Sequence, residues 1–134
     1  MNKKVQIFSI VIGLIILLLG VPLGLYSSTY NDQTATWEQK NQQQLINELN
    51  DPNIVIVDLR EESLYKQGHI PNAINIPFTE ITERYVELNK DKKIVFVCHT
   101  GSMGEDSSQF LINNGYMNVS NLTGGMAKWS GPIS

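Results

Sequence analysis

Four consecutive apolar residues at positions 94–97 (IVFV) constrain the fold of this chain more than any other feature. A run without a polar residue is typical of a strand buried on both faces, as in the middle of a parallel sheet. A second run, at 54–57 (IVIV), predicts another central strand. Because parallel strands need crossover connections, usually helices, we expect strands and helices to alternate. The predicted class is α/β, with a central parallel sheet covered by helices on both faces.

The segments between these strands have the apolar spacing of short helices. We expect helices over 41–50, 61–67, 79–88 and 105–114, with Asn41 and Thr79 as N-caps. Shorter strands are expected at 37–39, 73–76 and 119–122, with a turn at 124–125 and a closing helix from residue 126.

Cys98, the only cysteine of the chain, follows the central strand directly. A short loop with two glycines leads from it to the helix predicted at 105–114. In such a strand–loop–helix arrangement, the N–H groups of the loop and the positive end of the helix surround one point and stabilise a thiolate there. A thiolate is a nucleophile, so Cys98 is the candidate catalytic residue. The alternative is a buried cysteine that serves only as a small apolar side chain.

Charge and cysteine content exclude several functions. Without Lys3 and Lys4 the chain has 8 basic and 13 acidic residues, so we expect no nucleic-acid partner. A single cysteine excludes an intramolecular disulfide and a four-cysteine zinc site. The two histidines, His69 and His99, have no metal-ligand spacing. We expect no metal and no cofactor, and a monomeric domain.

The chain begins with an uncharged stretch at 5–26, directly after Lys3 and Lys4. As a helix this stretch would be about 33 Å long, enough to cross a hydrocarbon core of about 30 Å. The lysines would stay in the cytoplasm, which would place the rest of the chain outside. We expect a single-pass membrane anchor, with a cleaved signal sequence and a secreted domain as the alternative. The predicted organisation is an anchor or signal sequence at 1–26, a linker at 27–36 and one globular domain at 37–134.

Four motifs in sequence order resemble those of the rhodanese (sulfurtransferase) domain: 56–61 (IVDLRE), 68–77 (GHIPNAINIP), 98–101 (CHTG) and 124–129 (GGMAKW). The resemblance spans 45–132 and implies a three-layer rhodanese-like α/β domain with a central parallel sheet, here preceded by one transmembrane helix. It also implies that Cys98 takes a sulfane sulfur from a donor as a persulfide and passes it to a nucleophile. The donor would be thiosulfate, a persulfide or a polysulfide, and the acceptor a thiol, cyanide or sulfite.

The loop after Cys98 would hold the charged persulfide through its backbone N–H groups. Because the chain has no second cysteine, the persulfide would have to pass to an external acceptor. A protonated His99 would favour the thiolate, or the side chain would point to solvent. The residue at position 103 would contact an apolar donor or simply fill space. The expected substrate-binding loop comprises His99, Thr100, Gly101, Ser102, Met103 and Gly104.

Family loops often carry arginine directly after the cysteine and at the sixth loop position, where this chain has His99 and Met103. Glu105 and Asp106 follow, and their charge competes with an anionic donor for the field of the helix. We therefore expect a weak reaction with thiosulfate and a preference for organic persulfides or polysulfides.

Three residues outside the loop are expected to support the site rather than to react. Asp58 and Arg60 follow the predicted strand at 54–57, and we expect them to pair with each other or with the backbone. His69 lies in a Gly-His-Ile-Pro turn, where its side chain is expected to hold the loop.

Two other functions compete with the sulfurtransferase. One is a non-catalytic binding or adaptor module that uses the same cleft, which the absent loop arginines favour. The other is a phosphatase or arsenate reductase on a related loop. That chemistry needs an arginine to hold the oxyanion, and Met103 and Gly104 supply none.

Overall fold

The computed structural model describes residues 35–134. The anchor predicted at 1–26 and most of the linker predicted at 27–36 lie outside these residues. Within residues 35–134, no helix combines the length and the apolar character that crossing a membrane requires.

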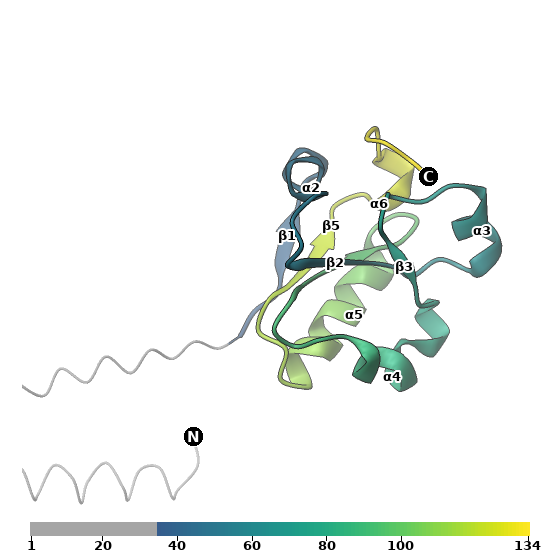
Figure 1. The fold of residues 1–134 in the computed structure, drawn as a ribbon. Coiled ribbons are helices and arrows are strands. Elements are labelled where there is room, and N and C mark those ends of the chain that lie inside the picture. Colours follow the sequence, from purple (N-terminus) through teal and green to yellow (C-terminus); the bar gives the residue numbers. More distant parts are fainter. Residues whose placement is uncertain (1–34) are drawn as a thin grey trace, which may run out of the picture. The chain divides into compact units, whose positions relative to one another are not determined.

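Parallel strands form one sheet with the order β1-β5-β4-β2-β3 (Figure 1). The two strands with continuous apolar runs, β2 and β4, are neighbours, and their register pairs Asp58 with Val97. Both therefore end at the same edge of the sheet, where Cys98 follows β4. The strands are β1 Glu38–Lys40, β2 Ile54–Asp58, β3 Ile74–Asn75, β4 Lys93–Val97 and β5 Val119–Leu122.

Helices lie on both sides of this sheet, which confirms the predicted α/β class with a central parallel sheet (Figure 1). In Figure 1, α2 and α6 lie on one side, and α4 and α5 lie on the other. The helices are α2 Gln42–Glu48, α3 Glu62–Gln67, α4 Ile81–Arg84, α5 Ser102–Asn113 and α6 Gly125–Lys128, with 3₁₀ turns η2 Phe78–Glu80 and η3 Tyr85–Glu87.

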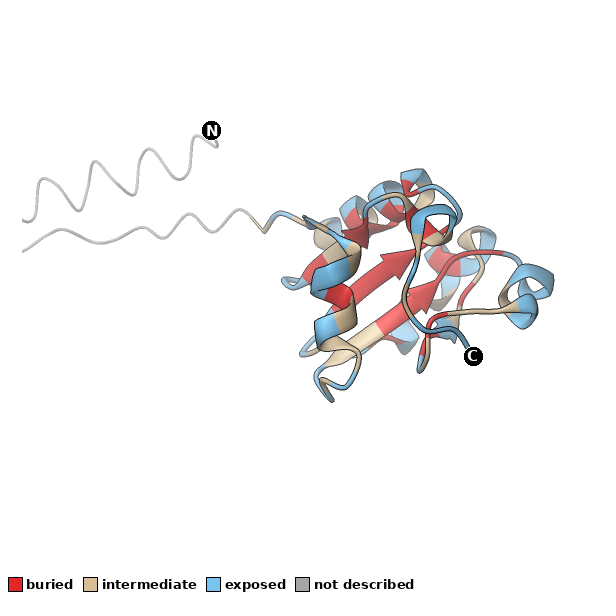
Figure 2. Cartoon of the chain, turned by 90° about the horizontal axis from the view of Figure 1, so that it is seen from above, coloured by how far each residue is buried: buried red, intermediate tan, exposed pale blue. Residues whose placement is uncertain are grey.

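Two apolar clusters fill the space between the sheet and its helices, and the strands between them are largely buried (Figure 2). One cluster joins Phe96 of β4 to Leu111 of α5 and to Tyr116. The other joins Val95 of β4 to Leu45 of α2. Because adjacent residues of β4 enter opposite clusters, both faces of the strand are covered, as its continuous apolar run predicts.

The helix α2 begins where its sequence predicts. The Oδ1 atom of Asn41 accepts a hydrogen bond from the Gln44 N–H at 2.9 Å, and Gln44 Oε1 accepts one from the Asn41 N–H at 2.8 Å. This capping box satisfies N–H groups that the first helical turn leaves without partners. Leu45 then faces the sheet and is fully buried.

Two predicted helix starts were wrong. Thr79 is not an N-cap, because it lies inside η2, and the predicted helix is divided into η2, α4 and η3. The helix α5 begins at Ser102 instead of Glu105, because Gly101 takes a left-handed backbone conformation with φ of +116° and turns the chain directly into the helix. The small residues of the first turn of α5 gave no helical pattern in the sequence.

The buried Tyr116 side chain ties the helical stretch at 78–88 to the core. Its hydroxyl oxygen lies 2.7 Å from the carbonyl oxygen of Tyr85 and 2.9 Å from that of Leu88. Desolvation by burial raises the pKa of this hydroxyl, and the charge of Tyr85 adds to the effect.

We expect Tyr116→Phe to lower the free energy of unfolding by about 1–3 kcal/mol, because buried carbonyl groups lose their donor. The pKa of Tyr116 is higher in the folded protein than in the unfolded one, so its neutral hydroxyl stabilises the fold at pH values below about 10, the pKa of an unfolded tyrosine. This contribution to the free energy of unfolding is lost as the pH rises further. The difference between the two proteins should therefore shrink above that pH in urea unfolding. Tyr85→Phe is the control, because no protein acceptor lies within reach of its hydroxyl among residues 35–134. Equal losses in both variants would contradict the assigned role of Tyr116.

Candidate active site

The loop that carries Cys98 is short and tightly bounded. It begins where β4 ends at Val97 and reaches α5 at Ser102. Gly101, the residue before the helix, has a positive φ that other residues adopt only with strain. The chain therefore turns from strand to helix within three residues of the cysteine, and α5 starts beside it.

The sulfur of Cys98 lies inside this turn. The residue is fully buried, and the Gly101 N–H donates a hydrogen bond to Sγ at 2.9 Å. A backbone donor and the amino end of a helix thus both lie beside the sulfur, and groups of this kind stabilise negative charge. The arrangement can therefore hold a thiolate or a charged persulfide, which is the chemistry predicted for Cys98.

The turn at Gly124 and Gly125 places α6 against the other side of the loop. The Met126 N–H donates to the Cys98 carbonyl oxygen at 2.8 Å, and the Ala127 N–H donates to that of His99 at 2.9 Å. A side chain on Gly125 would collide with the Cys98 carbonyl oxygen. Close packing of two backbones thus requires glycine here, where the sequence analysis predicted only a turn.

Asn121 supports the loop from β5, and the sequence analysis missed it. The residue is fully buried, and its Nδ2 donates to the Gly101 carbonyl oxygen at 3.0 Å. Its Oδ1 faces Gly104 so closely that a Cβ atom there would collide with it. Asn121 therefore fixes the peptide group next to the one that donates to sulfur. The signal in the sequence was a polar residue within a short buried strand.

Asp58 and Arg60 form the predicted pair, and the pair is buried. Arg60 Nη2 lies 2.6 Å from Asp58 Oδ2, and Arg60 Nε lies 3.0 Å from Asp58 Oδ1. Arg60 also donates to the Gly68 carbonyl oxygen, and Asn75 Nδ2 donates to the carbonyl oxygens of Asp58 and Arg60. The Leu59 N–H between them donates to the Val97 carbonyl oxygen at 2.7 Å, so the pair adjoins the strand that ends at the cysteine.

His69 is positioned by its own turn, as expected. Its Nδ1 lies 2.9 Å from the Tyr65 carbonyl oxygen, and its ring stacks on that of Tyr65 with centroids 3.8 Å apart. These contacts fix the turn that follows α3 and give His69 a structural role.

The remaining loop residues differ in exposure. His99, Thr100 and Ser102 are exposed, whereas Gly104 is buried. Met103 is half-buried and packs against the apolar cluster around Phe96 and Leu111. Of the two expectations for Met103, space filling is therefore the one that matches its contacts.

A groove flanks the loop on the side of β5 and α6. We call it the flanking groove; Gly101, Asn121, Thr123 and Lys128 are among the residues that line it.

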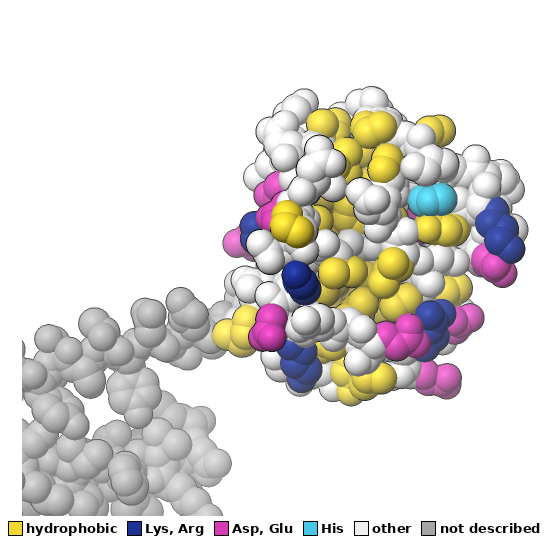
Figure 3. Space-filling view, viewed as in Figure 1, with side chains coloured by type: hydrophobic (Ala, Val, Ile, Leu, Met, Phe, Trp, Pro, Cys, Tyr) yellow, Lys and Arg dark blue, Asp and Glu magenta, His cyan; other side chains and the backbone are white. Residues whose placement is uncertain are grey.

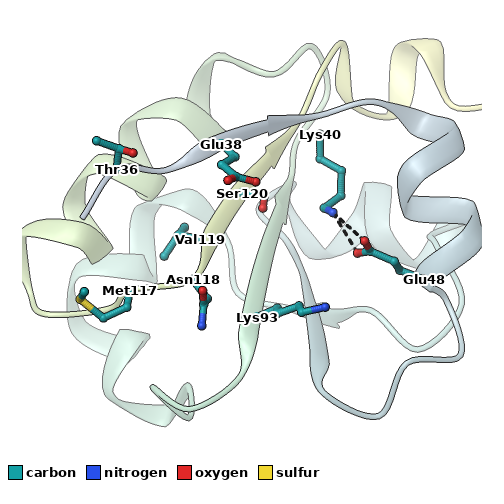
Figure 4. Close-up of a pocket in the computed structure, with 9 residues that line it drawn as sticks. All are labelled: Thr36, Glu38, Lys40, Glu48, Lys93, Met117, Asn118, Val119 and Ser120. Carbon is teal, nitrogen blue, oxygen red and sulfur yellow. Dashed lines mark hydrogen bonds and ion pairs between the residues drawn. The ribbon is translucent and has the colours of Figure 1, made fainter. Parts of the chain in front are cut away.

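A separate hollow, shown in Figure 4, lies along β1 and β5 and contains the ion pair between Lys40 and Glu48. No loop residue lines that hollow, so it is not part of the candidate site. Among residues 35–134 no acidic, histidine and cysteine side chains cluster as metal ligands do.

Comparison with known proteins places these features in one family. The Rhodanese-like domain family matches residues 41–132. A sulfurtransferase from Allochromatium vinosum is 34% identical over 77 residues, which cover 58% of this chain and 72% of that protein. A thiosulfate:glutathione sulfurtransferase from Saccharomyces cerevisiae is 33% identical over 92 residues, 59% of this chain and 66% of that protein.

Longer relatives share only a part of their length with this chain. A tRNA uridine(34) hydroxylase from Photorhabdus laumondii is 33% identical over 113 residues, which cover 80% of this chain and 32% of that protein. Another curated relative is covered over 44% of its length. The crystal structure of a rhodanese-related protein from Thermoplasma volcanium superposes with a TM-score of 0.68 at 28% identity, covering 73% of this chain and 98% of that one.

The buried ion pair gives a stability prediction. We expect Asp58→Ala to lower the free energy of unfolding by about 3–5 kcal/mol, because it leaves the Arg60 guanidinium buried without its counter-charge. The double variant Asp58→Ala/Arg60→Met should recover much of this loss, because no buried charge remains. Urea unfolding of both variants measures the effect.

Glu62→Ala is the matched control, because it removes the carboxylate of an exposed ion pair with Lys66 on α3, where Figure 3 shows basic and acidic side chains together at the surface. Exposed pairs contribute little, so its stability should stay close to that of the unmodified protein. If Asp58→Ala cost no more than Glu62→Ala, the buried pair would not stabilise the site.

Proposed function

The chain belongs to the rhodanese-like domain family, and on this basis we propose that it is a sulfurtransferase that carries a sulfane sulfur as a persulfide on Cys98. The observation that carries the proposal is the Gly101 N–H that donates to Cys98 Sγ at 2.9 Å beside the first turn of α5. Relatives named sulfurtransferases, at 30–34% identity, support the same activity.

The proposed reaction has two displacements at sulfur. The Cys98 thiolate attacks the sulfane sulfur of the donor, a new S–S bond forms, and the donor leaves as a thiolate or as sulfite. An acceptor thiolate, cyanide or sulfite then attacks the outer sulfur of the persulfide, and the Cys98 thiolate leaves. In each step one bond to sulfur forms and another breaks, and the departing group leaves with the electron pair of the broken bond. No cofactor takes part.

The proposed role of the loop is to stabilise the charged sulfur with backbone groups. When the persulfide forms, its negative charge moves outward by one atom, towards the amino end of α5. The chain has no second cysteine, so an external acceptor must remove the outer sulfur. His99 and Met103 stand at the two loop positions where related loops often carry arginine, so the loop offers no guanidinium group to an anionic donor.

A non-catalytic binding module is the second candidate, and one observation favours it. Cys98 is fully buried, so a donor reaches the sulfur only if the loop or its neighbours move. A module that binds a partner would need no such movement.

The location of the domain stays a prediction of the sequence. We propose that residues 5–26 anchor the chain and hold the domain outside the cytoplasm, on the grounds of their length and the lysines before them.

Persulfide formation separates the two candidates. After incubation of the reduced full chain with glutathione persulfide, intact mass spectrometry should show one added sulfur atom, and cyanide should remove it. Cys98→Ser should show no adduct, because serine does not form a persulfide. Thermal unfolding of this variant should remain close to that of the unmodified protein. A folded, reduced protein without an adduct would exclude the enzyme and leave the binding module.

The charge near the loop predicts the preferred donor. Glu105 is exposed in the first turn of α5 and the exposed Asp106 follows it, so both carboxylates oppose a dianion such as thiosulfate. We expect kcat/KM for thiosulfate to be well below that for glutathione persulfide. Glu105→Gln should raise the thiosulfate value by about 2- to 5-fold, the effect of one charge near a helix terminus.

Glu83→Gln is the control for this change, because it removes one exposed carboxylate from α4. It should leave the thiosulfate kinetics unchanged. Equal use of both donors by the unmodified protein would contradict the electrostatic argument.

A further inference from the structure

The flanking groove has a free cation on one wall. Lys128, in the last turn of α6, is exposed, and it forms no ion pair with any residue of the described part of the chain. The stem of its side chain lies against Gly124, where an added Cβ atom would come within 2.6 Å of Lys128 Cδ. The chain thus packs the lysine stem beside the Cys98 loop and leaves the ammonium group available in the groove.

Glu105 also lines the groove, and its neighbours orient its carboxylate. Gln39 Nε2 donates to Glu105 Oε1 at 2.8 Å, and Gln39 Oε1 accepts a hydrogen bond from Thr123 Oγ1 at 3.0 Å. Thr123 follows β5 and Glu105 lies in α5, so Gln39 links two of the elements that line the groove. The second carboxylate oxygen of Glu105 has no hydrogen bond to residues 35–134.

Two residues that hold the Cys98 loop also line the groove. Asn121 lines it and is fully buried, with its Oδ1 packed against Gly104 and its Nδ2 bonded to the Gly101 carbonyl oxygen. Gly101 also lines it, and its N–H is the donor to Cys98 Sγ. A ligand seated in the groove would therefore lie beside the peptide groups that hold the reacting sulfur.

A cation and a carboxylate facing one groove are complementary to a zwitterion. The volume of the groove, about 450 Å³, is that of a site for an amino acid or a small peptide and exceeds the needs of cyanide or sulfite. We propose that the flanking groove binds the amino-acid part of a zwitterionic thiol or its persulfide, with the ligand carboxylate on Lys128 and its ammonium group on Glu105. This inference rests on the sulfurtransferase function proposed above and names the class of its substrate.

The test compares two thiols as acceptors of the Cys98 persulfide in the full chain. Glutathione carries the zwitterion and 2-mercaptoethanol carries no charge. Lys128→Gln should raise KM for glutathione by about 5- to 10-fold with kcat unchanged, because one charge-assisted contact is lost. The kinetics with 2-mercaptoethanol should not change. Lys66→Gln, which removes an exposed lysine on α3, is the control for net charge and should affect neither acceptor.

A second measurement does not depend on sulfur transfer. S-methylglutathione cannot carry a sulfane sulfur, and its titration into the reduced full chain should shift the backbone NMR signals of Thr123 and Glu105. Lys128→Gln should weaken this binding by a similar factor. A protein that forms no persulfide yet binds S-methylglutathione through Lys128 would disprove the proposed transferase and support the groove. Unshifted signals, or equal effects of Lys128→Gln on both acceptors, would overturn the groove assignment.

Discussion

The hydrogen bond from the Gly101 N–H to the Cys98 sulfur is the interaction on which the rest of the site depends. It exists because the chain turns from strand to helix within a few residues, which requires the left-handed conformation of Gly101. The carbonyl oxygen of the same residue is held by Asn121. The N–H of Gly101 thus donates to the sulfur, and its carbonyl oxygen accepts from Asn121 of β5. These two hydrogen bonds fix the direction of the N–H group.

This fixed direction depends on close packing of the loop against α6 and of α5 against the Asn121 side chain. The carbonyl groups of Cys98 and His99 accept hydrogen bonds from the first turn of α6, and Gly125 allows that approach. On the other side, Gly104 lets α5 lie against Asn121. Glycine at these positions therefore reflects packing around the loop.

Charge is distributed unevenly around this loop. Arg60 lies close to the strand that ends at Cys98, but its buried guanidinium is bound by the Asp58 carboxylate and by the Gly68 carbonyl oxygen. It is therefore not available to replace the arginines that related loops carry. Glu105 and Asp106 add negative charge at the start of α5. Lys128 is the cation of the flanking groove that no other described residue neutralises, which makes it the residue most able to select an anionic group.

The sequence alone determined the class of fold, the two central strands, the nucleophile candidate and the expectation that Asp58 and Arg60 pair with each other or with the backbone. These follow from local patterns, because a continuous apolar run and a short charged motif keep their meaning in any fold of this class. The sequence did not show the start of α5 at Ser102, the role of Asn121, or the meeting of Lys128 and Glu105 in one groove. Each of these depends on contacts between residues far apart in the chain, such as β5 beneath the loop and α6 beside it. Only the parallel register, which brings the ends of β2, β4 and β5 together, decided which of these side chains became neighbours.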